Sequence, residues 1–171
     1  LDLLKITPGD RLIREQYVQF LTRAEKFKEA QTQATALVKA HADDLELILN
    51  LAAVQHQAGN SKASAATLKT YLEKSRKTEF DYLRIAKLLQ SYEFNSAATA
   101  VYRQLMEAFP ESISAREELA AHLFDSGKKE QARKFYLEMA EKAEGDVLIR
   151  IIRNLHSRAF TKDAYAVIQK N

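Results

Sequence analysis

Residues 79–112, EFDYLRIAKLLQSYEFNSAATAVYRQLMEAFPES, decide the fold. Apolar residues recur in this stretch three and four positions apart, in two sets that are separated by a short turn and followed by a proline. The first set is Tyr82, Ile85, Ala86 and Leu89, and the second is Ala98, Tyr102 and Leu105. This spacing places each set on one face of a helix. The stretch therefore predicts two antiparallel helices that are joined by a tight turn.

The same pattern returns along the chain at intervals of 34 residues. The aligned first positions are Arg11, Leu45, Glu79 and Ile113. A small residue also recurs in each unit, at Ala30, Ser64, Ala98 and Ala132. Two helices approach closely only where one presents little side chain, so these positions indicate the contact within each hairpin. The expected turns are Glu25-Lys26, Gly59-Asn60, Glu93-Phe94 and Gly127-Lys128, and the expected N-caps are Asp44, Thr78 and Ser112.

Four units in register resemble the tetratricopeptide repeat family, whose period is 34 residues and whose pattern runs aromatic-x-x-Leu-Gly-x-x-Tyr, then Ala-x-x-x-Phe, then Pro. The resemblance covers nearly all of the chain. The sequence departs from the pattern at Arg14 and Arg116, where a large aromatic residue is usual. Gln55 and Ala34 also replace large residues, in a first and a second helix respectively.

The resemblance implies an all-α fold, an α-solenoid of stacked antiparallel helix hairpins in a right-handed superhelix. We expect one domain over residues 1–171, with the end of a preceding repeat in 1–10 and a partial fifth repeat in 145–171, whose register is shifted by two residues. The intervening repeats are expected at 11–44, 45–78, 79–112 and 113–144. Because repeat arrays normally carry polar caps and Leu1, Leu3, Leu4 and Ile6 would lack a neighbour, we also expect that the chain was cut from a longer array, with ragged natural ends as the alternative.

Composition is that of a soluble globular chain, with 46% hydrophobic and 29% charged residues. The absence of Cys excludes disulfides and thiolate metal sites. A formal charge of +3 gives no electrostatic footprint for nucleic acid, and no apolar run approaches the roughly 18 residues that insert directly into a membrane. The compartment stays open between cytoplasm and bacterial periplasm.

Candidate catalytic chemistry is missing from the sequence. It has no Gly-rich phosphate loop, and its four histidines, His41, His56, His122 and His156, have no second His or Cys at metal-ligand spacing. The adjacent Glu117 and Glu118 point about 100° apart on a helix, so they do not form a catalytic pair. We therefore predict neither an enzyme nor a metal or other cofactor.

The family's first helices line a concave partner-binding face, and the resemblance carries this role to particular positions. The candidates are Glu15, Gln19, Leu49, Asn50, Ala53, His56, Phe80, Leu83, Arg84, Lys87, Glu117, Phe124, Arg150 and Arg153. This mixed apolar and charged lining suits an extended or helical peptide. It does not match the repeats that hold acidic chaperone tails, because Glu15 would repel a carboxylate where those repeats carry Lys.

The expected function is thus a scaffold that binds a protein or peptide, in the assembly of a multiprotein complex. Two alternatives stay open, a nucleic-acid-binding helical repeat and a non-catalytic regulatory arm of a larger enzyme. Successive first helices differ in charge sign, which argues against the former. The oligomeric state is left unassigned.

Overall fold

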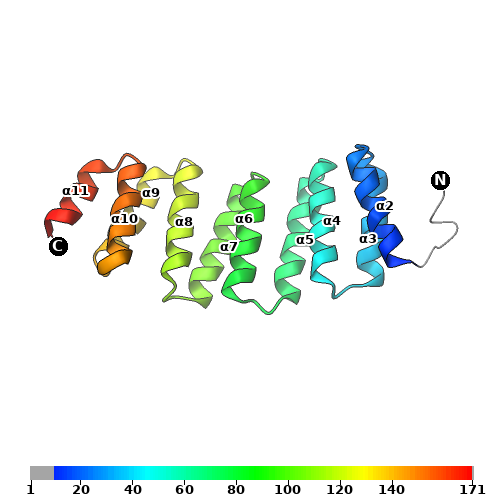
Figure 1. Ribbon diagram of the computed structural model, residues 1–171, viewed down its shortest axis with the longest axis horizontal. Helices are drawn as coiled ribbons and strands as arrows, with labels where there is room; N and C mark the ends of the chain where they lie inside the picture. Colours follow the sequence, from blue (N-terminus) through cyan, green and yellow to red (C-terminus); the bar gives the residue numbers. More distant parts are fainter. Residues whose placement is uncertain (1–9, 171) are drawn as a thin grey trace. The chain divides into compact units, whose positions relative to one another are not determined.

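The computed structural model describes residues 10–170, and every regular element in this range is an α-helix (Figure 1). The helices are α2 (Arg11–Arg23), α3 (Phe27–Ala40), α4 (Leu45–Gln57), α5 (Ser61–Lys74), α6 (Glu79–Ser91), α7 (Asn95–Ala108), α8 (Ile113–Asp125), α9 (Lys129–Ala140), α10 (Gly145–Ser157) and α11 (Thr161–Lys170). They follow one another as antiparallel pairs, which confirms the predicted all-α fold of helix hairpins. The expected end of a preceding repeat in 1–10 lies almost wholly outside the described residues.

The chain forms two compact units, Leu1–Asp81 and Tyr82–Asn171, here called unit 1 and unit 2. In unit 1, α2 packs on α3, α3 on α4 and α4 on α5. In unit 2, α7 packs on α8, α8 on α9, α9 on α10 and α10 on α11. Within each unit these helices pack on their neighbours in the sequence, which is the packing expected of a repeat array.

Side chains of the preceding loop cap most of the first helices. Asp44 accepts hydrogen bonds from the Glu46 and Leu47 amides, and Ser112 accepts one from the Ala115 amide. Thr78 and Asp81 form a reciprocal pair: each side chain accepts the backbone N–H of the other, at 3.2 and 3.0 Å. The three predicted N-caps are therefore confirmed. They explain why α4, α6 and α8 begin where the sequence pattern places them.

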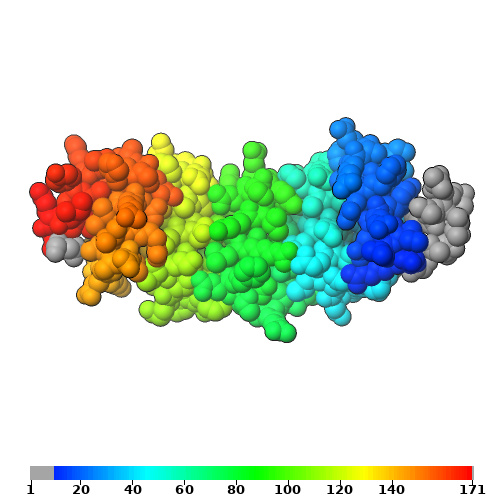
Figure 2. All heavy atoms as spheres, viewed as in Figure 1, coloured from blue at the N-terminus to red at the C-terminus, as the bar shows by residue number. Residues whose placement is uncertain are grey.

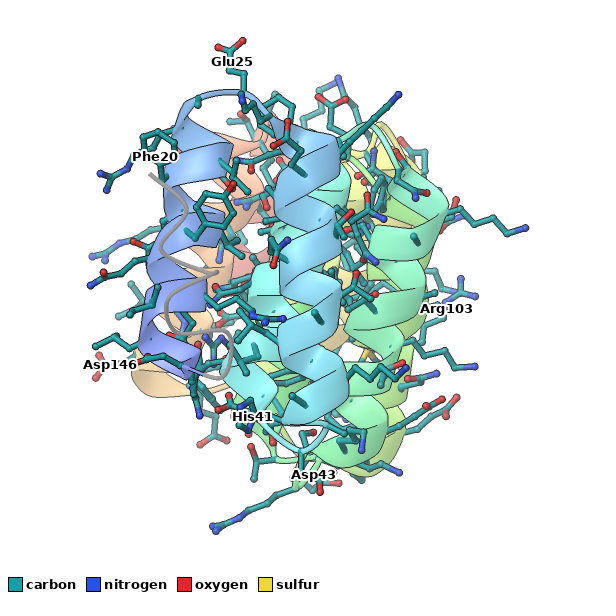
Figure 3. All side chains as sticks on the ribbon, turned by 90° about the vertical axis from the view of Figure 1, so that its right-hand side faces the viewer. Phe20, Glu25, His41, Asp43, Arg103 and Asp146 are labelled. Atoms are coloured by element: carbon teal, nitrogen blue, oxygen red, sulfur yellow. The ribbon has the colours of Figure 1, made fainter. Side chains whose placement is uncertain are left out.

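All five hairpins turn with the same backbone geometry. The turn residue adopts a positive φ in each, at Glu25, Gly59, Glu93, Gly127 and Ala159. In the second hairpin, the Gly59 amide donates to the His56 carbonyl at 2.9 Å and the Asn60 amide donates to the Gln55 carbonyl at 2.8 Å. Equivalent bonds close the other four turns, and Glu25 marks the tip of the first one (Figure 3). This arrangement satisfies carbonyls that the end of a helix leaves free.

Two opposite substitutions at this turn position are expected to change the free energy of unfolding in opposite directions. Gly59→Ala should lower the free energy of unfolding by about 1 kcal/mol, because a left-handed backbone strains a residue that carries a Cβ. The added Cβ itself would meet nothing within 4 Å. Glu93→Gly should raise the free energy of unfolding by a similar amount, about 0.5–1 kcal/mol. Urea denaturation measures both changes.

A matched control for this prediction lies in the interior of a neighbouring helix. Ala100→Gly, at an exposed site in α7, should destabilise by about 1 kcal/mol because glycine there is a poor helix former. If Glu93→Gly destabilises as much as Ala100→Gly, the positive φ of Glu93 stores no strain.

The recurrent small residues lie where the helices of each pair touch. All four, at Ala30, Ser64, Ala98 and Ala132, are completely buried. Ser64 also donates its hydroxyl to the Ala52 carbonyl of the partner helix at 2.8 Å, which requires close approach of the two helices. Large side chains such as Leu68, Tyr102 and Tyr136 are also completely buried, and the outer surface that covers them is drawn, coloured along the sequence, in Figure 2. The close approach expected at these positions is therefore confirmed at Ser64.

Candidate functional site

A groove of about 280 Å³ lies in unit 1 between α2, α3 and α4, here called the α2–α4 groove. Its floor is apolar and consists of Val18, Ala34, Leu37, Leu47, Ala53 and Val54. Its rim is polar and consists of Glu15, Gln19, Thr22, Arg23, Asn50 and Gln57. An apolar floor below a few polar groups is the usual composition of a binding pocket.

Ala34 lines the α2–α4 groove at a position where the other repeats carry a large residue. The positions at intervals of 34 residues from it carry Leu68, Tyr102 and Tyr136, and each of these fills the interior of its own hairpin with no exposed surface. Ala34 places a single methyl group at the equivalent point of α3. The departure from the repeat pattern that the sequence shows at Ala34 therefore coincides with an open space in the structure.

Arg11 links two carboxylates beside the rim of the groove. Arg11 donates from Nε to Glu15 at 2.5 Å and pairs through Nη2 with Asp44 Oδ2 at 2.7 Å. The Leu47 amide and the Arg11 guanidinium keep the pKa of Asp44 below its usual range, although partial burial opposes them. Glu15 and Asp44 therefore share the positive charge of Arg11, and the amides of Gln19 and Asn50 offer neutral groups that can bond a partner's backbone.

The predicted contact residues of unit 1 fall into two groups. Glu15, Gln19, Asn50 and Ala53 lie together in the α2–α4 groove. Leu49 does not line the groove, because it is 8% exposed and lies on the buried side of α4. The expectation that Leu49 faces a partner therefore needs correction, as successive residues of a helix point about 100° apart and Asn50 takes the outer position. His56 is half-buried and lies outside the groove lining.

The predicted charged residues of unit 2 bind one another between successive first helices. Lys87 of α6 pairs with Glu118 of α8 at 2.7 Å, and Arg150 of α10 donates to both oxygens of Glu117 at 2.7 and 3.0 Å. The hydrogen bond with Glu117 raises the pKa of Arg150. The alternation of charge sign that the sequence shows along the first helices is thus accounted for by contacts within the fold. Lys87 and Arg150 are less available to a partner than the sequence suggested.

The other predicted contact residues have varied surroundings. Phe80 is 69% exposed, Leu83 and Arg84 are half-buried, and Arg153 is exposed. Phe124 is half-buried and packs edge-on against Phe160, with ring centroids 5.8 Å apart. The structure does not gather these residues into the α2–α4 groove.

A buried histidine lies in unit 2 between α7 and α8. The ring of His122 packs against that of Tyr102, with centroids 5.3 Å apart, and its Nε2 lies 2.9 Å from Thr99 Oγ1 and 3.2 Å from the Asn95 carbonyl oxygen. Because the Thr99 hydroxyl already donates to that carbonyl, we assign the ring proton to Nε2, which donates to these oxygens. Burial lowers the pKa of His122, and Lys128 acts in the same direction.

The burial of His122 predicts a loss of stability in acid. The unfolded chain takes up a proton near pH 6.5, whereas the folded chain does so at lower pH. The free energy of unfolding should thus be steady above that range and decrease as the pH falls below it. Urea unfolding at successive pH values from neutral to mildly acidic measures this loss, and His122→Leu should lack this part of the pH dependence. An identical pH dependence in both proteins would rule out His122 as its source.

No group of three or more His, Cys, Asp or Glu side chains that could hold a metal ion occurs within residues 10–170. None of the described helices is both long enough and apolar enough to cross a membrane.

Comparison with known proteins gives matches among solved structures. No protein-family model matches the chain, and no curated protein matches it. The structure of MamA is similar with a TM-score of 0.53 at 15% identity, over 94% of this chain and 88% of MamA. YrrB, described as a TPR protein with an unusual peptide-binding site, is similar with a TM-score of 0.50 at 11% identity, over 98% of this chain and 88% of that chain.

A tetratricopeptide repeat protein from Parabacteroides merdae gives a third likeness. Its TM-score is 0.51 at 16% identity, over 98% of this chain and 66% of that chain. At such low identity these likenesses bear on the fold alone. Together with the 34-residue spacing and the five hairpins, they show that the chain has the fold of the tetratricopeptide repeat proteins.

Proposed function

We propose that the chain is a protein-interaction scaffold that binds an extended peptide in the α2–α4 groove. The observation that carries the proposal is the hollow at Ala34, where the other hairpins bury a Leu or a Tyr. The volume of about 280 Å³ lies just below the range of about 300–1,000 Å³ of small-molecule pockets. A space of that size suits one large apolar side chain of a peptide.

The rim supports an extended peptide backbone on either side of that anchor. Gln19 on α2 and Asn50 on α4 flank the floor, and each amide offers both donors and acceptors. A preformed helical groove loses little entropy on binding, so apolar burial at the anchor contributes directly to affinity. The proposed contact residues are Glu15, Gln19, Asn50 and Ala53. Ala34 makes room for the apolar side chain of the peptide.

We infer that the wider role of the chain is to bind a partner protein within a multiprotein complex. Four helix pairs would each be one repeat, with boundaries at 11–44, 45–78, 79–112 and 113–144, and the last pair would belong to a partial fifth repeat in 145–171. The peptide-binding site described for YrrB, a protein of the same fold, is consistent with such a role.

Selection from a random peptide library on the whole immobilised chain tests the proposal. We expect the selected peptides to share one large apolar residue, and we expect Gln19→Ala/Asn50→Ala to weaken them by about threefold or more through the loss of polar contacts. Lys62→Ala, at an exposed position of α5, is the matched control and should leave the affinity unchanged. If no peptide is enriched, or if the rim variant and the control bind alike, the groove is not the binding site.

A further inference from the structure

A second, polar pocket of about 240 Å³ lies wholly within unit 2. Glu117 and Glu118 of α8, Tyr136 of α9, Asn154 of α10 and Arg158, which caps α10, are among its lining residues. It differs from the α2–α4 groove in being lined mainly by polar groups. It also contains two buried donors that no group of the described residues satisfies.

The first of these donors is the Tyr136 hydroxyl. Tyr136 has no exposed surface, and its hydroxyl has no hydrogen-bond partner among the described residues. Burial raises the pKa of Tyr136 to about 12, although Arg158 opposes the shift, so the hydroxyl keeps its proton at neutral pH. Tyr102, the equivalent residue one hairpin earlier, differs in this respect because its hydroxyl donates to Gln90 Oε1 at 3.3 Å.

The second donor is Nε of Arg158. The guanidinium carbon lies 5.3 Å from the centre of the Tyr136 ring, and Nη1 donates to Asn154 Oδ1 at 2.7 Å. These contacts fix the guanidinium against the pocket wall. Its Nε is nevertheless buried and has no partner in the described part of the chain. Burying a donor without a partner is costly, so two such groups in one pocket point to a ligand that accepts from both.

Hydrogen-bond acceptors, the carboxylates of Glu117 and Glu118, line the same pocket. Lys87 approaches Glu118 through Oε1, and Arg150 holds Glu117 through Nε. Each carboxylate has about four lone-pair sites, so both can accept further bonds. A ligand carboxylate has no N–H to donate to the two glutamates, and a ligand ammonium has no lone pair to accept from the Tyr136 hydroxyl and Arg158 Nε. A neutral group that both donates and accepts can bond all four groups.

We propose that this pocket binds the primary carboxamide of an asparagine or glutamine side chain of a partner peptide. A primary carboxamide has two N–H donors and one oxygen with two lone pairs. Its oxygen accepts from the Tyr136 hydroxyl and Arg158 Nε, and its two N–H groups donate to Glu117 and Glu118. A backbone amide has a single N–H and leaves one of these carboxylates without a bond. The inference does not depend on the α2–α4 groove, which lies in the other unit.

A titration of the whole chain with small probes tests the site, with the Nε–H signal of Arg158 followed by NMR. The probe is N-acetyl-glutamine methylamide, and its glutamate and lysine counterparts share the same backbone amides. We expect the glutamine probe to shift the Arg158 signal and to bind at least about fivefold more tightly than the other two, since only its side chain satisfies every group. Equal binding of the three probes, or an unmoved Arg158 signal, would overturn the proposal.

The variant Tyr136→Phe and its matched control Tyr102→Phe complete the test. Tyr136→Phe should weaken the glutamine probe by about fivefold while its urea midpoint stays at or above the wild-type value, because no bond within the protein is lost and an unsatisfied buried hydroxyl is removed. Tyr102→Phe should lower the midpoint and leave probe binding unchanged, because its hydroxyl bonds Gln90. If Tyr136→Phe lowers the midpoint as much as Tyr102→Phe, or binds the probe as wild type does, a fixed internal water satisfies the hydroxyl and the carboxamide site is wrong.

Discussion

Leu119→Ala is expected to lower the free energy of unfolding of unit 2 by about 2–5 kcal/mol. Leu119 is 1% exposed and lies on the buried face of α8. Removal of its side chain costs the burial of three carbons and leaves a cavity that neighbouring helices cannot close without moving. Urea or thermal unfolding followed by circular dichroism measures the loss.

The control for Leu119→Ala is Ile149→Ala in the same unit. Ile149 is 47% exposed on α10, so its truncation should change stability by no more than about 0.5 kcal/mol. Should the two variants lose the same stability, Leu119 does not belong to the core, and the register of the fourth hairpin is wrong. The same reasoning applies to Ile85 in the third hairpin, which has no exposed surface.

Filling the hollow at Ala34 should have the second large effect, and in the opposite direction. Ala34→Leu copies the residue of the next hairpin, Leu68, and adds three carbons to the floor of the α2–α4 groove. At about 0.8 kcal/mol for each buried carbon, less the cost of ordering the side chain, unit 1 should gain about 1–2 kcal/mol. Urea unfolding measures the gain.

A leucine at an exposed position of a neighbouring helix provides the comparison for Ala34→Leu. Ala66→Leu, on α5, should stay within about 0.5 kcal/mol of wild type because its side chain remains in water. A loss of stability in Ala34→Leu would mean that the floor is already tightly packed and that the groove is too small to admit a side chain.

Much of the fold follows from the sequence because its local and long-range requirements agree. Asp44 and Ser112 cap the starts of α4 and α8, and the turn residues adopt the left-handed backbone that closes each hairpin. Ala30 and Ala132 show where two helices meet, because a larger residue would hold them apart. Each of these signals requires only spacing along the chain.

The candidate site was less predictable, for reasons that also lie in particular residues. Leu49 and Asn50 are adjacent in sequence, and only the packing of α4 decides which of them turns inward. Lys87 and Arg150 carry the charge that the sequence assigned to a partner, but their long side chains reach carboxylates on the neighbouring first helix. The sequence shows that Ala34 departs from the repeat pattern. It does not show whether a neighbouring side chain fills the space beside Ala34, and the hollow exists because none does.

The polar pocket of unit 2 could not be anticipated at all. Tyr136 matches the repeat pattern as an ordinary packing residue, and Arg158 follows the end of α10 with no motif around it. Their orphaned donors become visible only when every hydrogen-bond partner in three dimensions is known.

The central claim is that the hollow at Ala34 receives an apolar side chain of a bound peptide. Its most direct test is the calorimetric titration of one library-selected peptide into wild type and Ala34→Tyr, the residue that Tyr102 and Tyr136 supply elsewhere. We predict that Ala34→Tyr folds as wild type does and binds at least tenfold more weakly, which corresponds to about 1.4 kcal/mol. Equal affinity of the two proteins for that peptide would contradict the account.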